Sequence, residues 1–356
     1  MRVLLLSRYS RLGASSRVRF LQYLTFMESK GWQIEVSSLF SDDYLRALYH
    51  TDSGESSRWS SVIKGYWQRV MCLFQVRDYD LIWIEKELLP FFPAFAEWLL
   101  VKVGVKYVVD YDDALFHRYD LHRNALVRFF LKKKIDAVMR YATLVTVGNE
   151  YLARRAETAG AFQVELIPTV IDLLRYQPVM SAKKSTLLVG WIGSPATVHY
   201  LSMMAAVYVQ LAKEFDVRFV AVGVGEEAIG DLPVEVLPWS EETEVQLIQT
   251  FDIGIMPLTD SAWERGKCGY KLIQYMACGL PVVASPVGIN HQIVEHGVNG
   301  FLAHGPDEWE HSLRVLLSDQ ALRQSMGGAG RTRVEECYSL QVQAPRLESC
   351  LRGVLE

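Results

Sequence analysis

Short apolar runs separated by polar, glycine-rich segments recur along the whole chain. In the first half they cover residues 2–7, 32–39, 80–84, 106–109, 144–148 and 164–168. In the second half they cover residues 185–191, 217–223, 234–237, 251–257 and 282–284. Runs of this length, with helical patterns between them, are typical of buried parallel strands. The pattern predicts an α/β fold.

The chain length fits two domains. Its 356 residues are enough for two cores of ordinary size, and half of the residues are hydrophobic. A polar stretch with Pro178 and a Ser-Ala-Lys-Lys run indicates a linker that ends near Lys184. We therefore predict an N-terminal domain over residues 1–172 and a C-terminal domain over residues 173–356, each Rossmann-like.

The most specific segment lies between Ala262 and Gly288. A helix from about Lys267 would carry Lys267, Lys271 and Gln274 on one face, at spacings of four and three. Gly266 and Gly269 let the backbone approach a ligand where this helix begins, and the unpaired N–H groups there favour an anion. A phosphate group fits this pattern, whereas two solvated lysines on an ordinary amphipathic helix are the alternative.

This segment resembles a known family. The run KLIQYMACGLPVVASPVG, followed by Gln-Ile-Val-Glu and Gly-Val-Asn-Gly-Phe, is similar to the donor-binding segment of family 4 glycosyltransferases. The resemblance implies a retaining enzyme of GT-B fold, with two Rossmann-like domains facing an interdomain cleft. It also implies that the last helix crosses back to the N-terminal domain. One departure is clear, because Gly266 and Gln274 occupy the positions of the family's Glu-x7-Glu pair.

The resemblance extends the donor site to other segments of the C-terminal half. Gly193 and Ser194 form a tight turn before Pro195, which predicts a helix capped by Ser194 and a second phosphate-sized cradle. The family's usual Arg and Lys are missing after this turn, so Lys267 and Lys271 are the expected replacements. Trp239 is implied to lie beside the nucleobase, although a core tryptophan is the alternative.

Three more donor-side residues complete this half. Glu264 is the nearest carboxylate for sugar hydroxyls, Gln274 is expected to bind the ribose hydroxyls, and Tyr270 belongs to the same motif. Together with Gly13 and Arg17 of the first half, the candidate donor-binding residues are Gly13, Arg17, Gly193, Ser194, Trp239, Glu264, Gly266, Tyr270 and Gln274.

The first half also carries candidate chemistry. A loop with Gly13 precedes a helix over about 17–30, but it lacks the GxGxxG pattern of dinucleotide-binding folds. Arg17 and Arg19 in the first turn favour a bound anion, although two solvated surface arginines are the alternative. Carboxylates at 110, 112 and 113 follow a strand, and Asp112 is the candidate acceptor-side catalytic group. Metal binding, helix capping, or a base at His117 are alternatives there.

Charge is unevenly distributed. The net charge is −4, yet residues 1–172 hold 23 Lys and Arg against 20 Asp and Glu. Two stretches, 59–74 and 121–141, mix cations with aromatic residues. They predict either contact with an anionic membrane surface or helices that pack on their own sheet. Because no signal peptide or spanning segment is evident, we expect a cytoplasmic protein, peripheral on the inner face of the membrane if it touches one.

The five cysteines have no metal-ligand spacing and fit reduced thiols. We expect no metal, no cofactor and no nucleic-acid partner.

The expected function is therefore metal-independent transfer of a sugar, of hexosyltransferase type and with retention. The donor would be a UDP- or GDP-sugar, and the acceptor a glycan or lipid-linked glycan of cell-surface polysaccharide synthesis. Lys267 and Lys271 would stabilise the departing diphosphate. A sugar-nucleotide epimerase and a non-catalytic nucleotide-sugar-binding subunit are the alternatives, the second because the usual Glu pair is absent.

Overall fold

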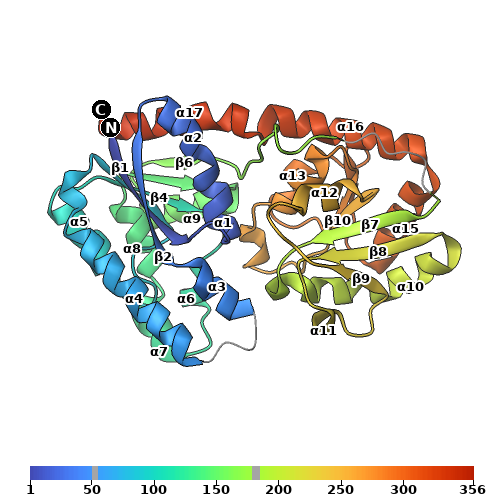
Figure 1. Ribbon diagram of the computed structural model, residues 1–356, viewed down its shortest axis with the longest axis horizontal. Helices are drawn as coiled ribbons and strands as arrows, with labels where there is room; N and C mark the ends of the chain where they lie inside the picture. The colour runs from blue at the N-terminus through green and yellow to red at the C-terminus, as the bar shows by residue number, and fades with distance from the viewer. Residues whose placement is uncertain (50–54, 179–184) are drawn as a thin grey trace. The chain divides into compact units, whose positions relative to one another are not determined.

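The chain forms two compact units, each with one six-stranded parallel sheet (Figure 1). The computed structural model describes residues 1–49, 55–178 and 185–356. Unit 1 comprises Met1–Thr169, Arg265–Cys268 and Gln343–Glu356, and unit 2 comprises Val170–Glu264 and Gly269–Val342. The predicted α/β class is confirmed, because helices cover two parallel sheets.

The sheet of unit 1 has the strand order β2-β1-β3-β4-β5-β6. Its strands are β1 (Arg2–Tyr9), β2 (Gln33–Phe40), β3 (Leu81–Glu85), β4 (Tyr107–Tyr111), β5 (Leu144–Val147) and β6 (Val164–Leu166). Every residue of β3, β4 and β5 is buried, as expected for central strands covered on both faces. Because β3, β4 and β5 run parallel, their carboxyl ends lie at the same edge of the sheet.

The helices of unit 1 connect these strands. They are α1 (Ala14–Arg19), α2 (Leu24–Ser29), α3 (Asp42–Tyr49), α4 (Glu55–Leu73), α5 (Phe95–Lys102), α6 (His117–Asp120), α7 (Ala125–Leu131), α8 (Lys134–Tyr141) and α9 (Glu150–Ala159), with 3₁₀ turns η1 (Leu21–Tyr23) and η2 (Val76–Asp78). The single helix expected over 17–30 is wrong, because Phe20 leaves helical geometry at ψ −63° and φ −132° and separates α1 from α2.

The sheet of unit 2 has the order β12-β11-β10-β7-β8-β9. Its strands are β7 (Leu187–Ile192), β8 (Val217–Val222), β9 (Val234–Leu237), β10 (Ile253–Met256), β11 (Val282–Ala284) and β12 (Gly300–Leu302). The strands expected from the apolar runs are confirmed. The expectation omitted β12, which begins at a glycine and has only two apolar residues after it.

The helices of unit 2 follow the same alternation. They are η3 (Pro195–Met204), α10 (Ala205–Glu214), α11 (Glu226–Ile229), α12 (Glu244–Gln249), η4 (Glu264–Gly266), α13 (Tyr270–Ala277), α14 (Asn290–Ile293), α15 (Pro306–Ser318) and α16 (Gln320–Cys337). A Cβ on Gly327 would lie 1.9 Å from Gly279 O, so α16 packs directly against the end of α13. Within the described ranges, no helix is long and apolar enough to cross a membrane.

The last helix is α17 (Leu340–Leu355). Its Pro345 lies inside the helix, where a proline normally argues against one. From Gln343 onward this helix belongs to unit 1. Trp32 Nε1 donates to Glu348 Oε1 over 2.9 Å, and Lys106 Nζ donates to Val354 O over 2.7 Å.

Candidate active site

Charged side chains gather at the carboxyl edge of the unit 1 sheet. Asp112 and Asp113 follow β4, and Lys86 follows β3. Lys86 Nζ lies 2.9 Å from Asp112 Oδ1 in an ion pair without hydrogen-bond geometry, and it donates to Asp113 Oδ2 over 2.6 Å. Ser15 Oγ donates to Asp112 Oδ2 over 2.6 Å. The candidate carboxylate is therefore held from two sides.

The surroundings of Asp112 keep it ionised. Burial acts to raise the pKa of Asp112, but the Lys86 charge and the Ser15 hydroxyl outweigh burial and lower it. Burial likewise opposes the charge of Lys86, yet Asp112 and Asp113 raise the pKa of Lys86 above its usual range. Lys86 also adopts φ 67°, a left-handed conformation rare for a residue with a side chain. This backbone strain accompanies its position between the two carboxylates.

A second carboxylate, missed in the sequence reasoning, lies beside this cluster. Glu85 ends β3 and is fully buried. Its Oε2 accepts from Arg8 N over 2.7 Å and from Ser16 Oγ over 2.6 Å, while its Oε1 has no hydrogen-bond partner among the residues described. Burial raises the pKa of Glu85. The signal in the sequence is its position directly after a buried strand, at the edge where open α/β sheets bind ligands.

The two arginines of α1 are not solvated. Arg19 Nε and Nη2 pair with the two oxygens of Asp110 over 2.9 and 2.6 Å, and Nη1 donates to Ile167 O over 2.8 Å. The expectation of an anion at Arg19 is therefore wrong, because its guanidinium holds β4 and the segment after β6. Arg17 is also buried, and its Nη1 donates to Arg11 O over 3.2 Å.

The glycine loop before α1 is packed for a steric reason. A Cβ on Gly13 would lie 2.3 Å from Tyr9 Cβ. The N–H of Gly13 donates to Ser10 O over 3.0 Å, so it already has an acceptor. Gly13 therefore supplies close backbone packing, and its own N–H does not point to a phosphate.

The segment Arg265–Cys268 belongs to unit 1 and lies beside Asp112. Asn149 Nδ2 donates to the carbonyls of Gly266 and Lys267 over 2.9 and 3.0 Å, and Cys268 Sγ donates to Asp112 O over 3.0 Å. A Cβ on Gly266 would lie 2.5 Å from Ala114 Cβ. Asn149, absent from the sequence expectations, thus ties the candidate lysine segment to the end of β5, and Cys268 ties it to Asp112 at the end of the neighbouring β4.

One expectation for this segment is wrong. Helix α13 begins at Tyr270, after Gly269 in the left-handed region at φ 65°, so Lys267 is not on the helix. The shared helical face of Lys267, Lys271 and Gln274 therefore reduces to Lys271 and Gln274. Lys271 Nζ lies 5.3 Å from the centre of the Trp191 ring in a cation–π contact.

The carboxyl ends of β7, β8 and β9 in unit 2 carry two glycines and a tryptophan. A Cβ on Gly223 would lie 2.4 Å from Gly193 O and 3.3 Å from Trp239 Cβ. The N–H of Gly193 donates to Val222 O over 3.0 Å. Ser194 is at the N-cap of η3, but the expected side-chain cap is wrong, since its hydroxyl makes no capping bond.

A buried hydrogen-bonded chain connects α13 to Trp239. Gln274 is 2% exposed, and its Nε2 donates to Tyr176 Oη over 3.0 Å. Tyr176 Oη donates to Glu244 Oε1, and Trp239 Nε1 donates to Glu244 Oε2 over 2.9 Å. Burial raises the pKa of Tyr176, and the nearby acidic groups add to it. Glu244 therefore holds the indole through its Nε1, and Tyr176 holds Glu244. The sequence analysis identified neither residue.

Glu264 is buried, and both of its carboxylate oxygens accept hydrogen bonds. Tyr200 Oη donates to Glu264 Oε1, and Ser261 Oγ donates to Glu264 Oε2. The role proposed for it from the sequence, contact with sugar hydroxyls, stays a prediction. Any such contact would have to use the remaining lone pairs of these two oxygens.

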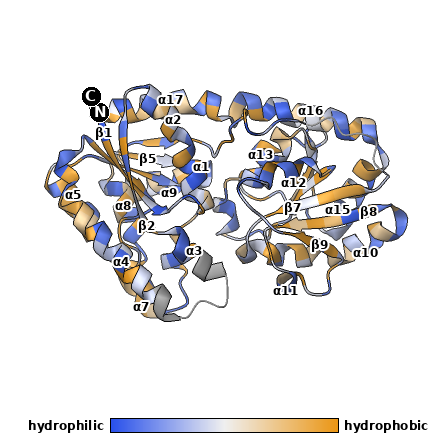
Figure 2. Ribbon diagram, viewed as in Figure 1, coloured by the Kyte–Doolittle hydropathy of each residue, from blue (hydrophilic) through white to orange (hydrophobic). Residues whose placement is uncertain are grey.

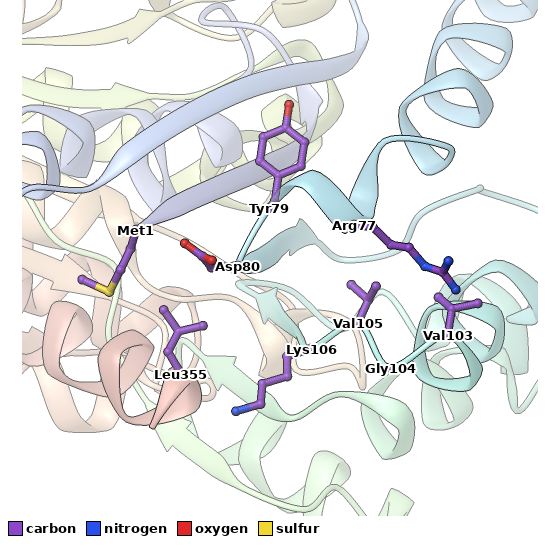
Figure 3. Close-up of a pocket in the computed structure, with 9 residues that line it drawn as sticks. All are labelled: Met1, Arg77, Tyr79, Asp80, Val103, Gly104, Val105, Lys106 and Leu355. Atoms are coloured by element: carbon purple, nitrogen blue, oxygen red, sulfur yellow. The ribbon is translucent and has the colours of Figure 1, made fainter.

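A hollow of about 600 Å³ lies at the opposite edge of the unit 1 sheet (Figure 3). Met1, Asp80 and Lys106 line it from the amino ends of β1, β3 and β4. Ligands of open α/β sheets bind at carboxyl ends, so the hollow is separate from the candidate site. Within the described ranges, no three His, Cys, Asp or Glu side chains form a metal-binding group.

Part of the chain is similar in sequence to known glycosyltransferases. Residues 183–319 match the family model described as glycosyl transferases group 1. The D-inositol 3-phosphate glycosyltransferase of Pseudarthrobacter chlorophenolicus is 27% identical over 139 residues, which cover 38% of this chain and 31% of that protein. The N-acetyl-alpha-D-glucosaminyl L-malate synthase of Bacillus anthracis is 20% identical over 245 residues, covering 65% of this chain and 63% of that protein. The matched parts thus span less than two thirds of either relative.

Solved structures match over almost the whole chain. The sucrose-phosphate synthase of Thermosynechococcus elongatus aligns with a TM-score of 0.73 at 14% identity, covering 99% of each chain. Anabaena HepE in complex with UDP and glucose aligns with a TM-score of 0.70 at 16% identity, also covering 99% of each chain. The chain has the GT-B fold.

The GT-B framework divides the candidate residues between its two units. Gly13, Arg17, Asp112, Gly266 and Lys267 lie in unit 1, and Gly193, Ser194, Trp239, Glu264, Tyr270, Lys271 and Gln274 lie in unit 2. The structure brings Asp112 together with the Gly266–Lys267 segment, and Gln274 together with Trp239. Of the candidate cations, only Lys271 lies in the unit that carries Trp239.

Proposed function

We propose that this protein is a retaining glycosyltransferase of hexosyltransferase type, whose donor is a UDP- or GDP-sugar. The acceptor is a glycan or lipid-linked glycan of cell-surface polysaccharide synthesis. The match of residues 183–319 to glycosyl transferases group 1 supports this proposal, as does the likeness to HepE, whose structure contains UDP and glucose.

One observation of the structure carries the proposal. The carboxyl ends of three adjacent strands of unit 2 present Gly193, Gly223 and an indole, Trp239, held by Glu244. The missing side chain of Gly223 lets the Gly193 carbonyl approach it, which brings the two strand ends together beside the half-buried Trp239. An indole ring held in this way can stack on a nucleobase. In this proposal Trp239 stacks on the base, and the turn at Gly193 and Ser194 faces the diphosphate.

The remaining donor groups follow from α13. Lys271, half-buried beside Trp191, supplies positive charge to the diphosphate. Tyr270, the first residue of α13, precedes Lys271 in the same sequence motif. Gln274 Nε2 keeps its hydrogen bond to Tyr176 Oη, and Gln274 Oε1 accepts a hydrogen bond from a ribose hydroxyl.

The chemistry needs charge placed in advance. Cleavage of the glycosidic bond builds positive charge on the sugar and negative charge on the departing diphosphate. Lysines already in place lower the barrier because little reorganisation is needed. We assign this role to Lys267 and Lys271. Asp112, kept ionised by Lys86 and Ser15, accepts a hydrogen bond from an acceptor hydroxyl and orients it. A carboxylate of lowered pKa is a weak base, so orientation is its main role.

Ligand-induced thermal stabilisation tests the donor site. UDP-, GDP- and CMP-sugars are added with EDTA to the wild type, to Lys271→Ala, and to Lys213→Ala as a control for an exposed lysine of α10. A ligand that binds the native state raises the melting temperature by mass action. We expect one diphosphate donor to stabilise the wild type and the control but not Lys271→Ala. Absence of stabilisation by every donor at millimolar concentration would reject the donor site.

Product analysis then separates the alternatives. Incubation of the stabilising donor without an acceptor should leave the sugar unchanged if the protein is a transferase. Conversion to an isomeric nucleotide-sugar would identify an epimerase. Donor binding with no transfer to any extracted glycan or lipid-linked glycan would indicate a non-catalytic subunit.

A further inference from the structure

Unit 1 carries an exposed apolar surface that is separate from the candidate site described above. It consists of the outward sides of α4, residues 91–101 and α7, and we call it the aromatic face. Figure 2 shows α5, within this face, largely in the colour of hydrophobic residues. A soluble protein rarely leaves a contiguous apolar surface of this kind without a partner.

Helix α4 contributes a stripe at helical spacing. Trp59, Ile63, Trp67 and Met71 follow one another at intervals of four residues, and Trp59 and Trp67 are 68% and 66% exposed. The opposite side of α4 is fixed on the sheet: a Cβ on Gly65 would lie 2.1 Å from Leu39 O. The stripe therefore has to point outward, where a helix of a soluble domain is normally polar.

The buried side of α4 adds a second anchor. Arg69 is 1% exposed and its Nη2 donates to Ser7 O over 2.5 Å and to Ser37 O over 3.2 Å. Rotating α4 to bury its tryptophans would expose these bonds. The outward orientation of the stripe is thus built into the packing of unit 1.

The segment after β3 contacts α4 on one side and, on the other, α6, which packs on α7. Tyr66 Oη donates to Pro90 O over 2.9 Å, and the Tyr66 and Phe92 rings lie 5.9 Å apart. On the other side, the Arg118 guanidinium lies 5.0 Å from the centre of the Phe91 ring. Phe91 and Phe92 are themselves exposed, so the apolar surface continues from α4 along this segment.

Helices α5 and α7 extend this surface. Phe95, Trp98 and Leu99 are exposed on α5, whose buried side carries Leu100. On α7, Leu131 is buried in the core, whereas Phe129 and Phe130 are 74% and 71% exposed. An outer surface that is apolar on several helices at once fits an apolar or interfacial environment better than water.

In the part of the aromatic face whose side chains the structure describes, from Trp59 onward, the exposed charges are positive. Residues 59–77 and 121–135 contain no Asp or Glu, and Glu97, the only acid between 91 and 106, is buried. The exposed cations at or beside this surface are Lys64, Arg77, Lys102, Arg118, Lys132 and Lys133. Exposed aromatic side chains with cations and without acids are complementary to anionic lipid headgroups over an acyl layer.

We infer that the aromatic face docks unit 1 on an anionic lipid bilayer, with its aromatic side chains in the interfacial layer and its cations on the headgroups. A second copy of this chain is the less favoured occupant, because two basic faces would repel each other. The inference goes beyond the proposed function, since binding to a bilayer needs neither donor nor acceptor. On a bilayer, a lipid-linked acceptor would be presented to unit 1 directly.

Vesicle flotation of the full chain tests this inference. Vesicles of phosphatidylcholine with about one third phosphatidylglycerol are compared with phosphatidylcholine alone, at low and at raised salt. We expect binding to the anionic vesicles that weakens as salt rises. Phe129→Ser with Phe130→Ser should lower the bound fraction about tenfold, and Lys132→Glu with Lys133→Glu should lower it on anionic vesicles only.

Matched variants keep the test specific. Phe162→Ser removes an aromatic side chain that is 84% exposed in unit 1 outside the aromatic face, and Lys213→Glu reverses an exposed charge in unit 2. Both should bind vesicles as the wild type does. If the melting temperature shows that the α7 variant fails to fold, Trp67→Ser on α4 tests the same face independently and should also lower the bound fraction.

Three results would overturn the inference. The first is a wild type that does not float with anionic vesicles, and the second is a Phe162→Ser variant as impaired as the α7 variant. The third is a concentration-dependent dimer in sedimentation that the α7 variant abolishes, without vesicle binding, which would assign the face to a second copy. Donor-induced stabilisation is measured on the same samples, so failure of bilayer binding and failure of the proposed function are distinguished.

Discussion

The ammonium group of Lys86 lies 2.9 Å from Asp112 Oδ1, at the point where β3 and β4 end side by side. Lys86 adopts φ 67° at this position, and the side chains of Lys86 and Asp112 are only 7% and 15% exposed. A buried charge without its counter-ion is strongly unfavourable, so the pair is maintained as a unit. The ionised state of Asp112 therefore depends on Lys86.

Removing Lys86 should destabilise unit 1 in a pH-dependent way. Because the pKa of Asp112 is lowered in the folded state, its ionisation stabilises the fold at neutral pH, and this contribution is lost as pH falls through that lowered pKa. In Lys86→Met the carboxylate is buried without its cation, and its pKa should rise. We expect a loss of about 3 kcal/mol in the free energy of unfolding near neutral pH.

Urea denaturation at neutral pH and at about pH 5 checks this prediction. The deficit of Lys86→Met relative to wild type should shrink at the lower pH, where protonation of Asp112 relieves the unpaired charge. Lys213→Met, at an exposed position, should leave stability unchanged at both values. An equal deficit at both values would mean that Lys86 acts through packing alone.

Replacing Glu244 should weaken unit 2 and release the indole. Glu244→Ala leaves Tyr176 Oη and Trp239 Nε1 without their acceptor. A buried donor left unsatisfied costs about 1–3 kcal/mol, and the Tyr176 hydroxyl is buried whereas the Trp239 bond is partly buried, so we expect a loss of about 3 kcal/mol in stability. The fluorescence of Trp239 should also shift as its ring gains freedom, which a Trp239→Phe background verifies. Glu226→Ala, an exposed carboxylate of α11, serves as the control and should change neither property.

The sequence predicted the sheets well because buried parallel strands leave a simple signal. The runs at 80–84, 144–148 and 282–284 became β3, β5 and β11 with only small changes at their ends. Apolar runs of this kind depend on burial on both faces, which is a local property of the sequence. The division between helices was less predictable. Helix α1 ends at the fully buried Phe20, and α2 begins only after the 3₁₀ turn η1, a break that the spacing of apolar residues did not reveal.

The candidate site was predicted by residue type more than by contact. Asp112 and Trp239 were expected from their strand ends, and the structure places both at carboxyl edges. Their partners were not foreseen, since Lys86 is 26 residues from Asp112, and Gln274 is 98 residues from Tyr176. Such pairings follow from the strand order. Lys267 was misplaced because the helical spacing continued through Gly269, where the backbone turns left-handed.

Adding a methyl group at Gly266 should disturb the segment that holds Lys267. A Cβ there would lie 2.5 Å from Ala114 Cβ and 2.7 Å from Ala114 N, and a backbone atom cannot move aside as a flexible side chain can. We expect Gly266→Ala to destabilise the protein by about 2 kcal/mol in thermal or urea unfolding. Gly305→Ala is the control, because no atom lies within 4 Å of the added Cβ. Equal stability of the two variants would show that the Gly266 segment is not docked on Ala114.

Cys268 should resist alkylation in the native protein. Burial raises the pKa of the Cys268 thiol to about 12, against the weaker opposing effect of Arg19. Near pH 8 the thiolate fraction is then about a thousandfold below that of an ordinary cysteine, and access is blocked as well. Mass spectrometry after iodoacetamide treatment should show Cys268 unmodified while the half-buried Cys337 reacts. In urea the two thiols should react at similar rates, and fast native modification of Cys268 would contradict its packing against Asp112.

Asp112 and Trp239 should affect different halves of the reaction. Asp112→Asn keeps the shape of the side chain but loses the charge that, in the proposed function, accepts a hydrogen bond from a hydroxyl of the acceptor. A charged hydrogen bond contributes about 1.5–3 kcal/mol, so kcat/KM for the acceptor should fall about 10- to 100-fold while donor-induced stabilisation is unchanged. Trp239→Leu should instead raise KM for the donor and reduce that stabilisation. Since the pKa of Asp112 is lowered, its ionisation should not produce an acid limb between about pH 5 and 8 in wild-type activity. An acid limb in that range which disappears in Asp112→Asn would instead make Asp112 the general base, with a pKa raised by the bound acceptor.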